Sequence, residues 1–243
     1  MNHALCRFCK APLTQTFADL GMLPFSNSFL KEDQLRKMEP YFPLHAFVCE
    51  SCFLVQIEEF ESPQQIFSDY AYFSSFSDSW LKHAEAYCAQ MSELLKLGAH
   101  SQVVELASND GYLLQYFKQR NIPVLGIEPA ENVAKVALKK GIPTEIVFFG
   151  VKTAEQFAAR GTKADLLLGN NVLAHVPDLN GFVQGMQILL KPQGLITMEF
   201  PHLYRLMEQN QFDTIYHEHF SYFSLFTVEK IFAKHGLTIF DVE

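Results

Sequence analysis

The fold is decided by the stretch Val103-Val104-Glu105-Leu106-Ala107-Ser108-Asn109-Asp110-Gly111-Tyr112. Its first four residues predict a short buried strand, and the apolar residues that follow Tyr112 predict a helix. Between them lies a tight polar turn that ends at Gly111. A strand, a small-residue turn and a helix are typical of the first nucleotide-binding unit of an α/β sheet, where a ligand meets backbone N–H groups at the start of the helix.

The acidic residues near this turn indicate which nucleotide it could hold. A second predicted strand, 124–127, is followed by Glu128, whose carboxylate can accept hydrogen bonds from both hydroxyls of a ribose. A dinucleotide site requires G-x-G-x-x-G, whereas this turn has one glycine and carries Glu105 and Asp110. Two carboxylates would repel a pyrophosphate and suit a cationic ligand with an amino-acid end, such as S-adenosylmethionine (SAM). We therefore favour SAM over a dinucleotide, with an ordinary turn that binds no ligand as the remaining alternative.

The composition excludes several classes of protein. Of the 243 residues, 49% are hydrophobic and 19% are charged, which is typical of a globular protein. The net charge of −8 argues against a nucleic-acid partner, because phosphates require a basic face. No apolar run approaches the roughly 18 residues of a membrane span, and the N-terminus lacks a signal-peptide pattern. We expect a cytoplasmic protein with no membrane partner.

Four of the five cysteines form two C-x-x-C pairs, Cys6 with Cys9 and Cys49 with Cys52. Two such pairs supply four thiolates for tetrahedral zinc, and four protein ligands leave no open position on the metal. The sequence therefore predicts a structural zinc site in the first part of the chain. The fifth cysteine, Cys88, falls on an amphipathic helical stretch and is expected to be buried as an apolar residue.

Strand and helix patterns alternate through the rest of the chain. Helices are expected over residues 80–97, 132–140, 152–160, 182–190 and 227–235, and further strands over residues 143–149, 165–168, 195–199 and 237–242. This alternation predicts an α/β fold with a doubly wound, mostly parallel sheet whose ligands bind at the carboxyl ends of the strands. We expect a zinc-binding domain at 1–65, an aromatic segment and linking helix at 66–98, and a Rossmann-like domain at 99–243.

A second polar stretch, Tyr216-His217-Glu218-His219, lies among aromatic residues after the fifth predicted strand. The spacing of its two histidines is wrong for two metal ligands on one helical face. A base that acts near neutral pH fits the stretch better. The alternative is a surface turn that happens to contain two histidines.

With these motifs in view, the sequence resembles the class I SAM-dependent C-methyltransferases that act on nucleotide-linked keto-deoxysugars. The resemblance covers nearly the whole chain. The motifs that carry it are, in order, Cys6-x-x-Cys9, Leu23-Pro24-Phe25-Ser26-Asn27, Cys49-x-x-Cys52, Tyr70-x-Tyr72-x-Ser74-Ser75, the turn at 105–111, Asn170-Asn171-Val172-Leu173-Ala174-His175-Val176, and Tyr216-His217-Glu218-His219-Phe220. The two cysteine pairs together with the last motif are specific, whereas the turn alone is not.

The resemblance implies a mechanism in which a base removes a proton from the carbon beside a sugar ketone, and the enolate then attacks the sulfonium methyl group. His219 matches the family's base, with Glu218 beside it, and Tyr72 and Tyr216 match hydroxyls that polarise the ketone or hold the enolate. The residues that the resemblance assigns to the cofactor are Glu105, Ala107, Asp110, Gly111, Glu128, Asn170 and Asn171.

The sequence departs from the family pattern in two places. Ala107 stands where the family usually has glycine, which is expected to tighten the turn. Relatives also continue well beyond the position of Glu243, through an antiparallel strand that lies between strands five and six of the sheet. We therefore expect a fragment, or a truncated enzyme with impaired activity. The alternatives are a zinc and SAM-fold binding module without catalysis, or a methyltransferase acting on oxygen or nitrogen of a small molecule.

Overall fold

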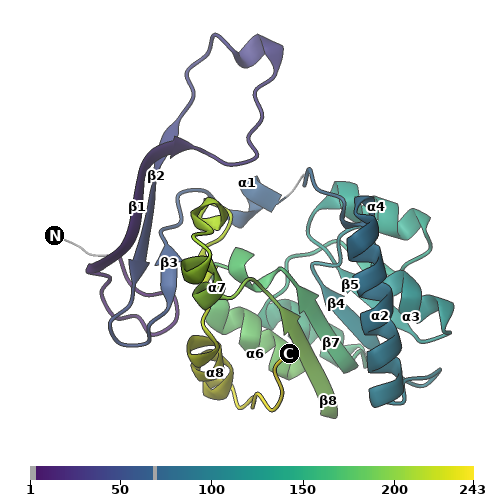
Figure 1. The fold of residues 1–243 in the computed structure, drawn as a ribbon. Coiled ribbons are helices and arrows are strands. Elements are labelled where there is room, and N and C mark those ends of the chain that lie inside the picture. The colour runs from purple at the N-terminus through teal and green to yellow at the C-terminus, as the bar shows by residue number, and fades with distance from the viewer. Residues whose placement is uncertain (1–3, 68–69) are drawn as a thin grey trace. The chain divides into compact units, whose positions relative to one another are not determined.

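The computed structural model describes residues 4–67 and 70–243, so the predicted segments 1–65 and 66–98 each include residues outside this description. The chain forms two compact units (Figure 1). The first unit contains the residues up to Ser62 together with Leu173–Asn180 and Phe200–Glu243. The second unit contains Pro63–Val172 and Gly181–Glu199.

The second unit is built on a five-stranded parallel sheet with the strand order β6-β5-β4-β7-β8. Its strands are β4 (Val103–Leu106), β5 (Val124–Ile127), β6 (Thr144–Glu145), β7 (Ala164–Asn170) and β8 (Leu190–Glu199). The predicted strand 103–106 is the central one, and Val103 lies opposite both Val124 and Leu166. Because both faces of such a strand are covered, β4 is buried throughout. The predicted α/β fold class is confirmed.

The α-helices between residues 63 and 189 are α1 (Pro63–Phe67), α2 (Asp78–Leu94), α3 (Leu114–Gln119), α4 (Glu131–Lys139), α5 (Val151–Ala159) and α6 (Leu179–Leu189), with a 3-10 turn at Ser74–Phe76. Helices α3 to α6 connect these strands, and α1 and α2 precede the first of them. Cys88 and Met91 of α2 pack with Phe117 of α3 and Leu166 of β7 in one hydrophobic core. Cys88 is thus a core residue, as its helical pattern predicted. None of the helices in the described part of the chain is long and apolar enough to cross a membrane.

The first unit contains a four-stranded antiparallel sheet, β1 (Gln15–Pro24), β2 (Tyr41–Val48), β3 (Val55–Ile57) and β9 (Ser221–Tyr222). Its helices are α7 (Leu203–Glu208) and α8 (Leu225–Lys234), and it has 3-10 turns at Glu32–Gln34, Leu173–His175 and Phe212–Thr214. Residues far apart in sequence meet at one edge of the sheet, where Gln56 of β3 pairs with Ser221 of β9. This pairing explains why Phe200–Glu243, which we expected in the Rossmann-like domain, belongs to the first unit.

The structure corrects three expectations about strands. The predicted strand at 237–242 is wrong, because these residues form no strand and pair with none of the described strands. A strand there would need a neighbour, and β8 pairs only with β7. The strand expected at 195–199 begins earlier, at Leu190, as β8, and the expected strand 143–149 shrinks to Thr144–Glu145.

Candidate functional site

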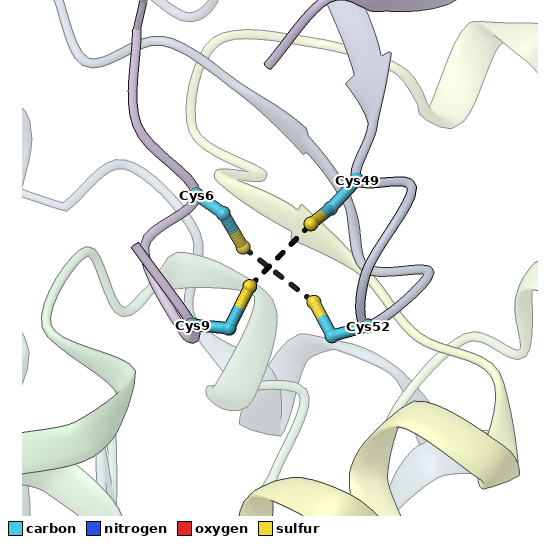
Figure 2. A group of neighbouring side chains, drawn as sticks. All are labelled: Cys6, Cys9, Cys49 and Cys52. Carbon is cyan, nitrogen blue, oxygen red and sulfur yellow. Dashed lines mark hydrogen bonds between the residues drawn. The ribbon is translucent and has the colours of Figure 1, made fainter. Parts of the chain in front are cut away.

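The four paired cysteines converge in the first unit (Figure 2). Their sulfur atoms all lie within 4.8 Å of one another. Cys6 Sγ is 3.6 Å from Cys52 Sγ, and Cys9 Sγ is 3.5 Å from Cys49 Sγ. Zinc–sulfur bonds of about 2.3 Å in a tetrahedron place the sulfurs about 3.8 Å apart, so these residues fit zinc. With four thiolates around it, the metal would have a structural role.

The two cysteine turns have the same backbone design, although their sequences differ. The N–H groups of Lys10 and Phe53 donate to the carbonyls of Cys6 and Cys49 at 2.9 and 2.8 Å. Lys10 and Phe53 also share a left-handed backbone, with φ of 65° and 63°. This conformation normally favours glycine, and at an ordinary residue it costs about 1–2 kcal/mol. The sequence gives no signal of this strain, because neither position is glycine.

Sequence reasoning missed Gln56, which is almost completely buried beside the cysteines. Its Nε2 donates to Cys6 Sγ at 3.2 Å, and its Oε1 accepts from the Arg7 backbone N–H at 2.8 Å. The Cys52 thiol, with smaller contributions from backbone groups and Gln56, lowers the pKa of Cys6 to about 4. Cys6 therefore readily forms the thiolate that binds zinc, whereas burial raises the pKa of Cys9 and the hydrogen bond to Cys6 raises that of Cys52.

The predicted cofactor turn follows β4 in the second unit and has an unusual backbone. Ala107, Asn109 and Gly111 adopt φ values of 54°, 50° and 76°. A Cβ atom added to Gly111 would lie 2.9 Å from Ile142 Cγ1, so both the backbone and the space require glycine there. The left-handed φ at position 107 explains why glycine suits this position. The Ala107 methyl group makes that backbone conformation less favourable by about 1–2 kcal/mol.

The predicted acidic residues gather around this turn and are buried. Glu105 and Asp110 are 0% exposed, and Glu128 is 5% exposed. The Glu128 oxygens accept from the N–H groups of Asn109 and Ala130, each at 2.8 Å. Asp110 Oδ2 accepts from Lys140 Nζ at 3.0 Å and from the Ser75 hydroxyl. Lys140 is thus the cation that balances part of this charge.

Glu105 lacks such compensation. Neither of its oxygens makes a hydrogen bond of ordinary geometry with the residues described, although the nearby Tyr112 side chain opposes part of the rise in its pKa. Burial, then the charges of Glu128 and Asp110, raises its pKa well above the ordinary value. A buried carboxylate without a donor is costly unless a ligand supplies one. This arrangement fits SAM, whose ammonium and sulfonium groups carry positive charge.

The structure places the two predicted asparagines at the same edge of the sheet. Asn170 ends β7, and Asn171 follows with a φ of 53°. The Asn171 N–H donates to the carbonyl of Glu199 at the end of β8, at 2.7 Å. Because the carboxyl ends of parallel strands meet at one edge, Asn170 lies on the same side of the sheet as Glu105 and Glu128.

Tyr72 lies on the segment before α2, and two asparagine side chains hold this segment. Asn109 Nδ2 donates to the Tyr72 carbonyl at 3.0 Å, while Asn109 Oδ1 accepts from the Ser74 N–H at 3.0 Å. Asn132 forms a similar pair of bonds with the backbone of Tyr70, at 3.0 and 2.7 Å. The Tyr72 side chain is exposed. The anchoring role of the two asparagines could not be read from the sequence.

His219 is held in one tautomer in the first unit. Its Nδ1 lies 3.0 Å from the Thr214 carbonyl, which can only accept, so Nδ1 carries the proton. Its Nε2 is then unprotonated, and the Nε2 lone pair accepts a hydrogen bond from the Tyr216 hydroxyl at 3.0 Å. Burial lowers the pKa of His219 to about 4, so the ring is neutral at physiological pH. A neutral imidazole with one accessible lone pair can act as a base.

The Glu218 side chain is hydrogen-bonded to a residue far away in the sequence. Its Oε1 accepts from Asn27 Nδ2 at 2.7 Å, and burial raises its pKa. Two rings that pack against His219 are those of Tyr216, with centroids 4.2 Å apart, and His175, which lies edge-on with centroids 4.7 Å apart. Burial, followed by the nearby His219, lowers the pKa of His175 to about 3. The catalytic role expected for Glu218 beside His219 stays a prediction.

The predicted site residues fall into two groups, one in each unit. Tyr216, Glu218 and His219 belong to the first unit together with the cysteine cluster. Tyr72 and all seven predicted cofactor residues belong to the second unit. Each group is organised by contacts within its own unit.

Comparisons with known proteins divide the chain along its sequence, so residues 200–242 fall in the methyltransferase match although they belong to the first structural unit. Residues 6–67 match a family model described as "Putative zinc binding domain", and residues 79–242 match one described as "Methyltransferase domain". The chain is 35% identical over 237 residues to the C-methyltransferase NovU of Streptomyces niveus, an alignment covering 98% of this chain and 56% of that protein. It thus spans little more than half the length of this relative.

Two further proteins are similar over shorter stretches. The ubiquinone biosynthesis O-methyltransferase of Bartonella bacilliformis is 29% identical over 99 residues, 39% of each chain. A solved SAM-dependent methyltransferase of Archaeoglobus fulgidus is 17% identical, with a TM-score of 0.49 over 63% of this chain and 68% of that one. The methyltransferase model covers about two thirds of the chain, and the chain therefore belongs to the methyltransferase domain family.

Proposed function

We propose that this chain is the cofactor-binding and proton-abstracting part of a SAM-dependent C-methyltransferase, and that it methylates the carbon beside the ketone of a nucleotide-linked keto-deoxysugar. The observation that carries the proposal is the neutral, oriented imidazole of His219, with Nδ1–H bonded to Thr214 and Nε2 bonded to Tyr216. Methylation of a carbon next to a ketone requires such a base, since the carbon is not nucleophilic until it loses a proton.

The cofactor-binding part of the proposal rests on the turn after β4. Glu105, Asp110 and Glu128 supply three buried acidic groups, and Lys140 forms an ion pair with Asp110. Glu105 and Asp110 suit the positive groups of SAM, and Glu128 suits the ribose. Gly111 keeps the turn tight, while Asn170 and Asn171 border the same edge of the sheet. When bound, SAM supplies a methyl group on a sulfonium, which a carbanion can attack in line.

In the proposed reaction, His219 Nε2 takes a proton from the carbon beside the ketone, and the electron pair of the broken C–H bond moves onto the ketone oxygen. The Tyr216 hydroxyl, which donates to Nε2 in this structure, is then free to donate to that oxygen. Tyr72 is a second hydroxyl that can stabilise the enolate. The carbon next forms its bond to the methyl group as the carbon–sulfur bond breaks, and His219 releases its proton to water.

Deuterium exchange tests this proposal without requiring methyl transfer. The zinc-loaded protein is incubated in D₂O with a thymidine-diphosphate-linked keto-deoxysugar, and the proton beside the ketone is followed by NMR. We expect exchange that is lost in His219→Gln and retained in His100→Gln, a variant at an exposed histidine. Tight SAM binding without exchange would instead support methyl transfer to oxygen or nitrogen, or a binding module without catalysis.

A further inference from the structure

Arg7, which lies between the first two cysteines, is partly buried, and its guanidinium contacts three residues. Its guanidinium donates to the carbonyls of Pro177 at 3.0 Å and Ile57 at 2.6 Å. The same group lies over the ring of Phe220, 5.4 Å from the ring centroid. All of these partners belong to the first unit. The first cysteine turn is thereby joined to the segment that contains His219.

The charge of Arg7 is retained at a cost. Among the described residues no carboxylate forms an ion pair with it, and its Nε has no hydrogen-bond partner. Buried charges are costly unless they are paired, and an apolar side chain would fill this space more cheaply. The role of the planar, forked guanidinium is therefore to donate hydrogen bonds to two carbonyls at once and so to hold their segments together.

Each of these carbonyls belongs to a segment that contacts His219 or the residue directly after it. Pro177 is two residues after His175, whose ring packs against His219. Ile57 accepts from Arg7 and donates its own N–H to the carbonyl of Phe220 at 3.1 Å. The N–H of Phe220 donates to the carbonyl of Ala174 at 2.8 Å. Phe220, the residue directly after His219, is thus fixed through both of its backbone groups and through its ring.

The cysteine cluster in turn fixes Arg7. Its backbone N–H donates to Gln56, the same side chain that donates to Cys6 Sγ. Its backbone carbonyl accepts from Asn180 Nδ2 at 3.2 Å. The position of the guanidinium therefore depends on the turn that the metal ligands close.

We propose that Arg7 is a positioning residue for methyl transfer, through which the zinc-binding cysteine turn holds His219 in the orientation that presents Nε2 as the basic nitrogen. This inference rests on the proposed function, in which His219 is the base. It gives the zinc site a role beyond the local stability of the first residues.

The tautomer of His219 tests the proposal at a pH at which zinc stays bound. Ring ¹⁵N shifts are measured at pH 7.5 in zinc-loaded protein with labelled histidine, and the His219 signals are identified by their absence in His219→Gln. We compare Arg7→Met, which keeps apolar contact with Phe220, with Arg36→Met, which removes an exposed arginine elsewhere in the first unit. We expect one tautomer, protonated at Nδ1, in the wild type and Arg36→Met, and a mixture of tautomers in Arg7→Met.

Kinetics supply the second readout. Where the wild type turns over, kcat of Arg7→Met should fall by about 10- to 100-fold while KM for SAM stays unchanged, since small displacements of a reacting group are costly. A zinc-loaded Arg7→Met with His219 still purely in the Nδ1–H tautomer overturns the proposal. If Arg7→Met does not retain zinc, Arg7→Lys replaces it, because lysine keeps the charge but lacks the fork. A mixed tautomer in Arg7→Lys supports the proposal, and the wild-type tautomer overturns it.

The tautomer measurement needs no substrate, so it separates the two claims. Absence of deuterium exchange in the wild type would reject His219 as the base. The tautomer in Arg7→Met would still decide whether Arg7 holds the imidazole.

Discussion

The Tyr216 hydroxyl donates to Nε2 of His219 at 3.0 Å, and this bond is possible only because the Thr214 carbonyl holds the ring proton on Nδ1. The two side chains lie one turn of backbone apart, since the His219 N–H also donates to the Tyr216 carbonyl at 3.0 Å. The phenol therefore marks the position at which an acidic group of the substrate would meet the base. It also stabilises the neutral form of the ring that proton abstraction requires.

Replacement of Tyr216 by phenylalanine tests this relationship. We expect kcat to fall by about 100-fold, because the variant loses a donor that can stabilise the enolate oxygen. SAM affinity, measured calorimetrically, should be unchanged, since all predicted cofactor residues lie in the other unit. The matched control is Tyr204→Phe, which removes an exposed hydroxyl from the first unit. An equal loss of kcat in both variants would contradict the assigned role.

Replacement of Glu105 by glutamine should stabilise the protein without ligand and weaken SAM binding. Because burial raises the pKa of Glu105, the folded state binds this proton more tightly than the unfolded state. Protonated Glu105 therefore contributes to the free energy of unfolding at low pH. This contribution decreases as the pH rises from about 4.5, the ordinary pKa of the group, through its raised pKa in the folded state. Glutamine removes that penalty but also removes the charge that attracts the cationic cofactor.

Thermal unfolding at pH 7.5 measures both effects of this substitution. We expect a higher Tm for Glu105→Gln without SAM and a smaller increase in Tm when SAM is added. Glu131→Gln, at an exposed carboxylate on α4, should change neither quantity appreciably. A Glu105→Gln protein that is less stable without SAM, or that binds SAM as the wild type does, would contradict this interpretation of the site.

The parts of the site that sequence reasoning found are those with a local signature. The strand, turn and helix around Gly111 and the cysteine pairs each lie within a few residues, so periodicity and spacing reveal them. Gln56 and Cys6 lie 50 residues apart, and Asn27 and Glu218 lie 191 apart. Such contacts depend on how the chain folds back on itself. The strand predicted at 237–242 failed for a related reason, since a local pattern does not supply a pairing partner.

Substitution of Gly126 by alanine should destabilise the protein, because β5 and the cofactor turn approach each other closely there. A Cβ atom at this position would overlap Ser108 Oγ and lie 3.0 Å from Ser108 Cβ and 3.1 Å from Thr144 Oγ1. We expect a loss of about 1–3 kcal/mol in the free energy of unfolding, the usual cost of overpacking. Urea denaturation measures it, with Gly98→Ala as the control, since a Cβ there meets no atom within 4 Å. Equal stability of the two variants would exclude a close approach at Gly126.

Loss of one cysteine ligand should remove the zinc and loosen the sheet of the first unit. Cys49 directly follows β2, and the turn it begins leads through Cys52 to β3. Metal content of Cys49→Ser should fall from about one zinc per chain to near zero, because three thiolates hold the ion less tightly than four. Hydrogen exchange should quicken at residues 47–57, where the Phe53 N–H and Leu54 carbonyl bond to Cys49. Cys88→Ser alters a buried cysteine of α2 outside the cluster, so it should keep the zinc and the slow exchange of 47–57. Equal zinc loss from both variants, or unchanged exchange in a zinc-free Cys49→Ser, would show that the metal does not stabilise this sheet.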